Sequence, residues 1–217
     1  MTDVHNLGLF ILAGWLLNLT PGPDVLYIVS SALRSGAKAG VVAALGITAG
    51  CFVHIFAAAL GVGALMAASS TAFTALKWAG AAYLFYVGLK LVLSPGTKPV
   101  ELTAENPVQT SDKHLKSIFF KGFLTNTLNP KVALFFLAFV PQFIAPQASH
   151  PALTFVLLGV LFNVNALPVN VGYALLATWA TRRLGAVQRA LHWLDRVAGV
   201  MFVGFGIRLA LTEAPGG

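Results

Sequence analysis

The sequence predicts an all-α integral membrane protein whose six transmembrane helices form two inverted repeats of three, with helices 1 and 4 interrupted. The first observation is composition: 57% of the residues are hydrophobic and only 10% are charged, which is far more apolar than a soluble domain. The second is a set of six apolar runs, each with about the 20 residues that a spanning helix requires. The third is a motif that recurs half a chain length later.

The six apolar runs are the expected helices, taken in order along the chain. Proline removes a backbone donor and obstructs helical packing, so Pro130 and Pro168 are expected to interrupt the fourth and fifth runs. The runs lie at about 7–30, 39–68, 72–93, 117–145, 152–180 and 190–211.

The most polar stretch lies near the middle of the chain, at residues 94–116, where three prolines stand among Thr, Glu, Gln and Lys. This composition predicts a hydrophilic loop. The loop divides a single transmembrane domain, residues 1–217, into repeat 1 (about 7–93) and repeat 2 (about 117–211). With three spans in each half, the halves have opposite topologies.

Fourteen basic residues against seven acidic ones give a net charge of +7. Eleven of the fourteen gather in or beside the connections on one side of the expected membrane, so the charge sets orientation and does not indicate a nucleic-acid partner. The positive-inside rule places the hydrophilic loop in the cytoplasm and both termini outside it.

Several classes of protein are disfavoured by what the sequence lacks. Cys51 is the only cysteine, so the chain can build neither an internal disulfide nor a CxxC redox or zinc site. No HExxH, GxSxG or Cys/His grouping occurs, which argues against an intramembrane enzyme. Neither a cofactor nor a bound metal is expected.

Residues 18–24 (Asn-Leu-Thr-Pro-Gly-Pro-Asp) break the first apolar run. Pro21 and Pro23 obstruct a helix, and Gly22 permits dihedrals that other residues avoid. A carboxylate at the depth of Asp24 costs about 2.5 to 3.5 kcal/mol, so it is expected to face a water-filled cavity or a partner. The alternative is that Asp24 only caps the helix that restarts after Pro23.

The same pattern returns in the second half. Residues 14–18 (Gly-Trp-Leu-Leu-Asn) match 122–126 (Gly-Phe-Leu-Thr-Asn), 108 residues later, and a second break follows at 129–131 (Asn-Pro-Lys). Interrupted helices at corresponding places in inverted halves indicate a transporter's binding site. Lys131 lies roughly 20 Å into its span, a long way for its ammonium group to reach water, although snorkelling is the alternative.

Four further polar residues lie within spans. His54 is a candidate proton carrier because its ordinary pKa is near neutral, or it simply bonds to a neighbouring helix. Asn163, Asn165 and Asn170 surround Pro168, where amides bind a substrate or bridge helices equally well. The candidate substrate-binding or coupling residues are Asn18, Pro21, Gly22, Pro23, Asp24, His54, Asn126, Asn129, Pro130, Lys131, Asn163 and Asn165.

The two broken motifs, followed by Phe135-Phe136 and by residues 141–143 (Pro-Gln-Phe), resemble those of the LysE/RhtB family of bacterial amino-acid exporters. The likeness extends over nearly the whole chain. It implies export of amino acids or close derivatives across the cytoplasmic (inner) membrane by proton antiport, and it leaves a homo-oligomer open. The apolar surroundings of the motifs favour a neutral side chain. A cation or metal exporter, or a channel, is the alternative, because Asp24 with asparagines can coordinate a cation that Lys131 would repel.

The expected mechanism joins the two breaks. Asp24 and Lys131 form an ion pair near the pseudo-two-fold axis, and the substrate zwitterion replaces it. When the substrate leaves, Asp24 takes a proton that returns to the cytoplasm; His54 is the alternative carrier.

Overall fold

The computed structural model describes residues 3–68, 111–145 and 147–179, together with single residues between 78 and 93 and between 196 and 207. Over these residues the chain is helical and contains no β-strand, only an isolated bridge between Val4 and Ile144. The expected third and sixth spans lie mostly outside the described residues. Six helices in two complete halves therefore stay a prediction.

The first break lies where the prolines predict it. Helix α1 (Leu7–Leu19) ends just before Thr20, and helix α2 (Pro23–Ala68) begins at Pro23. Proline suits the first position of a helix, because the N–H that it lacks would have no partner there and its φ is already helical. Residues 20–22 join the two helices, as expected from the sequence.

A correction concerns the connection between the first two expected runs, 7–30 and 39–68. Instead of a loop of several residues, a kink at Gly36 joins the end of the first run to the second, and only Gly36 leaves helical geometry inside α2, with φ 82° and ψ 174°. This φ favours glycine, which has no Cβ to clash. A methyl group added at Gly40 would lie 2.6 Å from the Cβ of Ala32, so two α2 arms, 23–35 and 37–68, fold closely against each other at this corner.

The second broken span is built in four pieces. Helix α4 (Asp112–Thr127) is followed after two residues by α5 (Pro130–Leu134), the π-helix η1 (Phe135–Phe139) and the 3-10 helix η2 (Val140–Phe143). The parts before and after the break are bent by 46°. The helix starts earlier than the expected residue 117, inside the stretch expected to be a loop, because Ser111 caps it and Asp112 suits its positive end.

Helix α6 (Pro151–Trp179) corrects a second expectation. Its 29 residues run through Pro168 without a break. Membrane helices tolerate proline because neighbouring groups and small local adjustments can satisfy the freed carbonyl. The fifth span is therefore one continuous helix.

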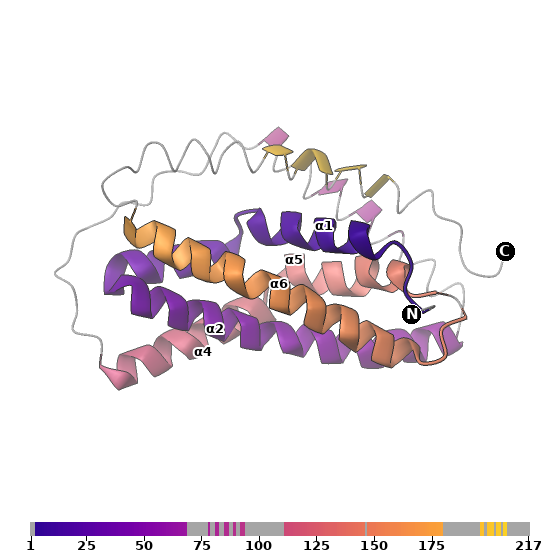
Figure 1. Cartoon of the computed structure of the whole chain (residues 1–217), viewed down its shortest axis with the longest axis horizontal. Coiled ribbons are helices and arrows are strands. Elements are labelled where there is room, and N and C mark those ends of the chain that lie inside the picture. Colours follow the sequence, from indigo (N-terminus) through magenta and orange to yellow (C-terminus); the bar gives the residue numbers. More distant parts are fainter. Residues whose placement is uncertain are drawn as a thin grey trace.

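Close packing of small residues holds α2 against α4. A methyl group added at Gly46 or Gly50 would collide with the backbone carbonyl of Phe119 or Phe123, and one at Gly122 would lie 2.7 Å from the carbonyl of Ala43. Such glycines let the backbones of membrane helices approach each other. As Figure 1 shows, α4 and α6 lie along α2, with α1 beside α6.

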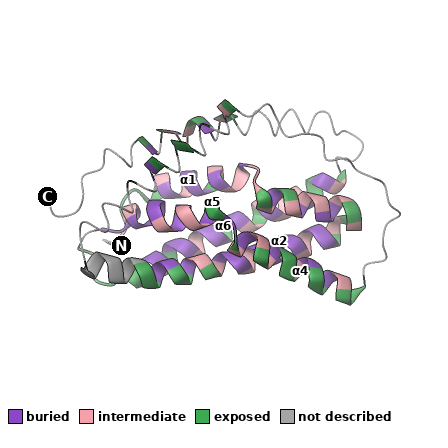
Figure 2. Ribbon diagram, turned by 180° about the vertical axis from the view of Figure 1, so that it is seen from behind, coloured by how far each residue is buried: buried purple, intermediate pink, exposed green. Residues whose placement is uncertain are grey.

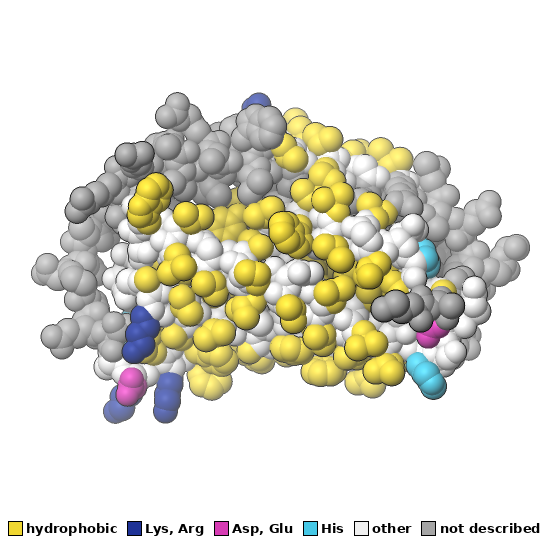
Figure 3. Space-filling view, in the orientation of Figure 1, with side chains coloured by type: hydrophobic (Ala, Val, Ile, Leu, Met, Phe, Trp, Pro, Cys, Tyr) yellow, Lys and Arg dark blue, Asp and Glu magenta, His cyan; other side chains and the backbone are white. Residues whose placement is uncertain are grey.

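The outer surface is that of a membrane protein. Two helical stretches, Pro23–Gly61 and Pro151–Trp179, are long and apolar enough to cross a bilayer, and α4 with its bent continuation is a third. Figure 2 shows exposed residues on the outer faces of these helices, many of which are large and apolar, such as Leu157 and Leu176. In Figure 3, most of the visible Lys and Arg side chains gather at the end where α4 begins, and the His side chains visible in this view lie at the other end.

The breaks correspond as the sequence repeat predicts. Helix α1 ends at Leu19 and α4 ends 108 residues later, at Thr127. Helix α2 starts at Pro23 and α5 at Pro130, an offset of 107. Figure 1 shows α1 and α4 running in opposite directions, as an inverted relationship requires.

Candidate functional site

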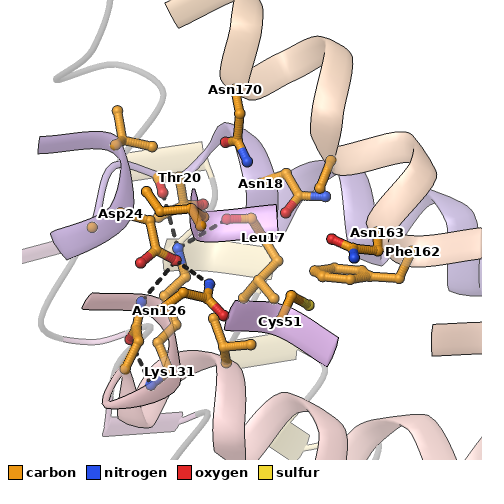
Figure 4. A pocket seen from close by; sticks show the side chains of 16 residues that line it. Leu17, Asn18, Thr20, Asp24, Cys51, Asn126, Lys131, Phe162, Asn163 and Asn170 are labelled. Carbon is orange, nitrogen blue, oxygen red and sulfur yellow. Dashed lines mark hydrogen bonds between the residues drawn. The ribbon is translucent and has the colours of Figure 1, made fainter. Parts of the chain in front are cut away.

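The two breaks border one buried cavity of about 30 Å³, shown in Figure 4. Its lining comes from the end of α1, the start and middle of α2, the α4–α5 break and the middle of α6. The polar lining residues are Asn18, Thr20, Asp24, Asn126, Asn129, Lys131, Asn163 and Asn170, and the remainder are Leu17, Gly22, Val25, Ile47, Cys51, Val132, Phe162 and Ala166.

Most of the candidate residues from the sequence meet at this cavity, but five do not line it. Pro21, Pro23 and Pro130 shape the breaks beside it, and His54 and Asn165 stand back from it. The sequence reasoning did not single out Thr20, nor any of the non-polar lining residues except Gly22.

Helical spacing in α6 explains which asparagines reach the cavity. Phe162, Ala166 and Asn170 are four residues apart and share one face of the helix, with Asn163 beside them. Asn165 is two residues from Asn163, which turns it away from that face. This spacing was the signal that distinguishes Asn170 from Asn165. Asn163 also bridges helices, because its amide donates to the Thr48 carbonyl at 3.0 Å.

Asp24 is held by the second half of the chain through one of its two oxygens. Its Oδ2 accepts hydrogen bonds from the side-chain amides of Asn126 at 2.9 Å and Asn129 at 3.0 Å. Asn129 is fixed in turn, since its own Oδ1 accepts from the backbone N–H of Lys131 and caps α5. The other oxygen, Oδ1, is buried and has no hydrogen-bond partner among the described residues.

Lys131 reaches the opposite way, into the first half. Its ammonium group donates to the backbone carbonyls of Leu17 and Thr20, both at 2.9 Å. These carbonyls lie at the C-terminal end of α1, where intrahelical partners run out and the helix dipole favours a cation. The Tyr173 hydroxyl donates to the next such carbonyl, that of Leu19, at 2.8 Å.

The two charged residues therefore hold the breaks reciprocally. Asp24 follows the first break and binds Asn126 before the second, whereas Lys131 follows the second break and binds Leu17 before the first. An ion pair between Asp24 and Lys131 was expected. Both residues line the cavity, and each also binds groups of the other half through the hydrogen bonds described above. The ion pair itself stays a prediction.

Three buried polar atoms of the lining have no hydrogen-bond partner among the described residues: Asp24 Oδ1, Asn126 Oδ1 and Asn18 Nδ2. Buried polar groups in proteins are nearly always hydrogen-bonded. The residues that line the cavity therefore hold two acceptors and one donor without a partner in the described part of the chain, which is the chemistry of a polar binding site.

His54 does not line the cavity, but it contacts the lining residue Asn126. Its Nε2 is 2.8 Å from the backbone carbonyl of Asn126, and since a carbonyl only accepts, Nε2 carries a proton. The ring is parallel to that of Phe136, with centroids 6.5 Å apart. His54 thus braces the residue that binds Asp24.

A bundle of apolar helices in which two broken helices enclose a buried charged cavity defines a membrane transport protein. The comparisons agree, because the LysE type translocator model matches residues 15–213. The chain belongs to this family, which is one of translocators and not of enzymes, and it is a multi-pass membrane protein.

Curated relatives align over almost their full length. A membrane protein of Pseudomonas aeruginosa is 36% identical over 93% of each chain. Another, from Vibrio cholerae, is 30% identical over 98% of this chain and 100% of its own. The leucine efflux protein of Salmonella typhimurium is 26% identical over 97% of each chain. No solved structure matches.

Proposed function

We propose that this protein is a secondary transporter that exports neutral, apolar amino acids or close derivatives across the bacterial cytoplasmic membrane by proton antiport. Family membership and the similarity to leucine efflux proteins support amino-acid export. The mixed lining of the cavity supports the same substrate class, since charged and amide groups suit a zwitterion and Val25, Ile47 and Phe162 suit an apolar side chain.

The observation that carries the antiport proposal is that the two oxygens of the Asp24 carboxylate differ in their hydrogen bonding. Oδ2 accepts from two amides, whereas Oδ1 is buried and has no hydrogen-bond partner among the described residues. A substrate ammonium group and a proton would compete for this one oxygen. Mutually exclusive binding at a shared site is what an exchange of substrate for proton requires.

The cavity must change shape during transport. Its volume of about 30 Å³ is far below the roughly 300 to 1,000 Å³ of ordinary ligand pockets. The two breaks are suited to this movement, because residues 20–22 and 128–129 join helices without continuing them. Rocking of the halves about the breaks would open the site to one side at a time.

We further propose six helices in two inverted halves within one domain, residues 1–217, with the loop 94–116 in the cytoplasm and both termini outside. The matching offsets of the two breaks support the inverted halves. The grouping of Lys and Arg at the end where α4 begins supports this end as the cytoplasmic one.

The test is transport by purified protein in proteoliposomes, driven by an imposed pH gradient. We expect wild-type protein to accumulate radiolabelled leucine against its gradient, and Asp24→Asn to abolish accumulation while it still inserts and folds. Asp112→Asn is the matched control, because it makes the same change at an exposed carboxylate outside the cavity. Accumulation by Asp24→Asn at the wild-type rate would exclude Asp24 as the carrier. Uptake of a divalent metal and of no amino acid would favour a cation exporter instead.

A further inference from the structure

We infer that two asparagines at equivalent places in the halves bind the two charged groups of the amino acid, the α-ammonium and the α-carboxylate. Asn126 Oδ1, together with Asp24 Oδ1, accepts from the α-ammonium group, and Asn18 Nδ2 donates to the α-carboxylate. This inference rests on the proposed function and deepens it. It predicts a site that requires both ends of the substrate and rejects simple amines and simple carboxylic acids.

The orientation of the Asn126 amide follows from its partner. Its Nδ2 donates to Asp24 Oδ2, which also accepts from Asn129, so Oδ1 is the atom that remains for a substrate. Asn126 is only 3% exposed, and this Oδ1 has no hydrogen-bond partner among the described residues. With Asp24 Oδ1, it makes a pair of buried acceptors, one of them charged. An ammonium group has three donors and a positive charge, and therefore satisfies both acceptors.

Among the described residues, Asn18 has its amide nitrogen unpaired, whereas Asn126 has its amide oxygen unpaired. It lies in the last turn of α1, 108 residues before Asn126, and its Nδ2 is buried without a partner among the described residues. Figure 4 shows it across the cavity from Asp24, on the side of Asn163. An amide donor is suited to a carboxylate oxygen. The ammonium group of Lys131 holds carbonyls of this same turn, so its positive charge lies near the carboxylate without replacing Asn18.

The arrangement also orients the substrate side chain. With its ends held by Asn126 and Asn18, the substrate directs its side chain toward the apolar lining from α2 and α6, which includes Val25, Ile47, Phe162 and Ala166. Asp24 and Lys131 are the charged members of the described lining. Asp24 accepts from the substrate ammonium group, and Lys131 binds the carbonyls at the first break. The site therefore suits a neutral, apolar side chain attached to an unmodified amino-acid backbone.

The experiment is competition against leucine counterflow in proteoliposomes. Leucinamide keeps the ammonium group and lacks the carboxylate, whereas 4-methylpentanoate keeps the carboxylate and lacks the ammonium group. A hydrogen bond to a charged group is worth roughly a tenfold to hundredfold change in affinity, so each analogue should compete that much more weakly than leucine. Asn18→Leu should lower the affinity for leucine by a similar factor and leave the affinity for leucinamide unchanged.

Asn126→Leu should lower the affinities for leucine and leucinamide and leave the affinity for 4-methylpentanoate unchanged.

The control is Asn165→Leu, the same change at an asparagine of α6 outside the cavity lining, which should leave all three affinities unchanged. Competition by either analogue as strong as that of leucine, or equal losses of affinity for all three ligands in each variant, would overturn the inference while leucine counterflow still supports the proposed function. Absence of counterflow with any neutral amino acid would contradict the proposed function itself.

Discussion

Lys131 donates a hydrogen bond from its ammonium group to the backbone carbonyl of Leu17, 114 residues earlier in the chain, at 2.9 Å. With the bond to Thr20, it closes the C-terminal end of α1 from the other half of the molecule. In the apolar interior of a membrane protein little water is available to satisfy these carbonyls, so a helix that stops there needs such a partner. The first break is therefore stabilised by the residue that follows the second.

Replacing Lys131 tests this cap. In Lys131→Met the carbonyls of Leu17 and Thr20 lose their cationic partner, which should lower the free energy of unfolding by about 2 kcal/mol. Lys131→Arg keeps the charge and should restore part of the loss. The measurement is thermal unfolding of purified protein in detergent.

Tyr173→Phe calibrates the result, because it removes one neutral hydrogen bond to the neighbouring Leu19 carbonyl and should cost about 1 kcal/mol. If Lys131→Met unfolds at the wild-type temperature, Lys131 does not stabilise the end of α1.

A second prediction concerns the contact between α2 and α4. A methyl group at Gly46 would collide with the Phe119 carbonyl, so Gly46→Ala should destabilise the protein by about 1 to 3 kcal/mol through overpacking. Gly172→Ala makes the same change in α6, where nothing lies within 4 Å, and should be neutral or stabilise the helix slightly. Equal unfolding temperatures for the two variants would contradict the close approach of α2 and α4.

The sequence was sufficient for features that depend on local chemistry. Pro21, Pro23 and Pro130 predicted where α1 and α4 stop, and the 108-residue offset predicted that the stops correspond. Proline was a poorer guide at Pro168, where α6 stays continuous, because a membrane helix can accommodate proline by local adjustment. The corner at Gly36 was not predicted, because a single residue with positive φ makes the turn for which the sequence suggested a loop.

The partners within the site were harder to predict. Every residue has a carbonyl, so nothing in the sequence shows that Lys131 binds those of Leu17 and Thr20. Asp24 and Lys131 carry opposite charges, which predicted an ion pair, but nothing in the sequence showed that the asparagines at the α4–α5 break also bind the carboxylate. Only tertiary geometry decides among such partners.

A third prediction separates the two candidate proton carriers. His54 contacts the backbone carbonyl of Asn126 and does not line the cavity, so it is expected to position Asn126 and not to carry the proton. His54→Gln should slow leucine export by roughly tenfold or less, the value of one hydrogen bond, and still allow accumulation driven by a pH gradient. Accumulation ratios in proteoliposomes check this. Loss of uphill accumulation with normal counterflow in His54→Gln would transfer the proton-carrying role from Asp24 to His54.

The last prediction fixes the orientation in the membrane. Ser149 precedes α6 and Ser111 caps α4, and both are exposed. If the end rich in Lys and Arg faces the cytoplasm, a membrane-impermeant thiol reagent added to intact cells should label Ser149→Cys and leave Ser111→Cys unlabelled. Cys51→Ala provides the background, since Cys51 is the only native cysteine and is buried. After the cells are opened, Ser111→Cys should react as well, which shows that its earlier protection came from the membrane. Labelling of Ser111→Cys alone in intact cells would invert the topology and, with it, the direction assigned to export.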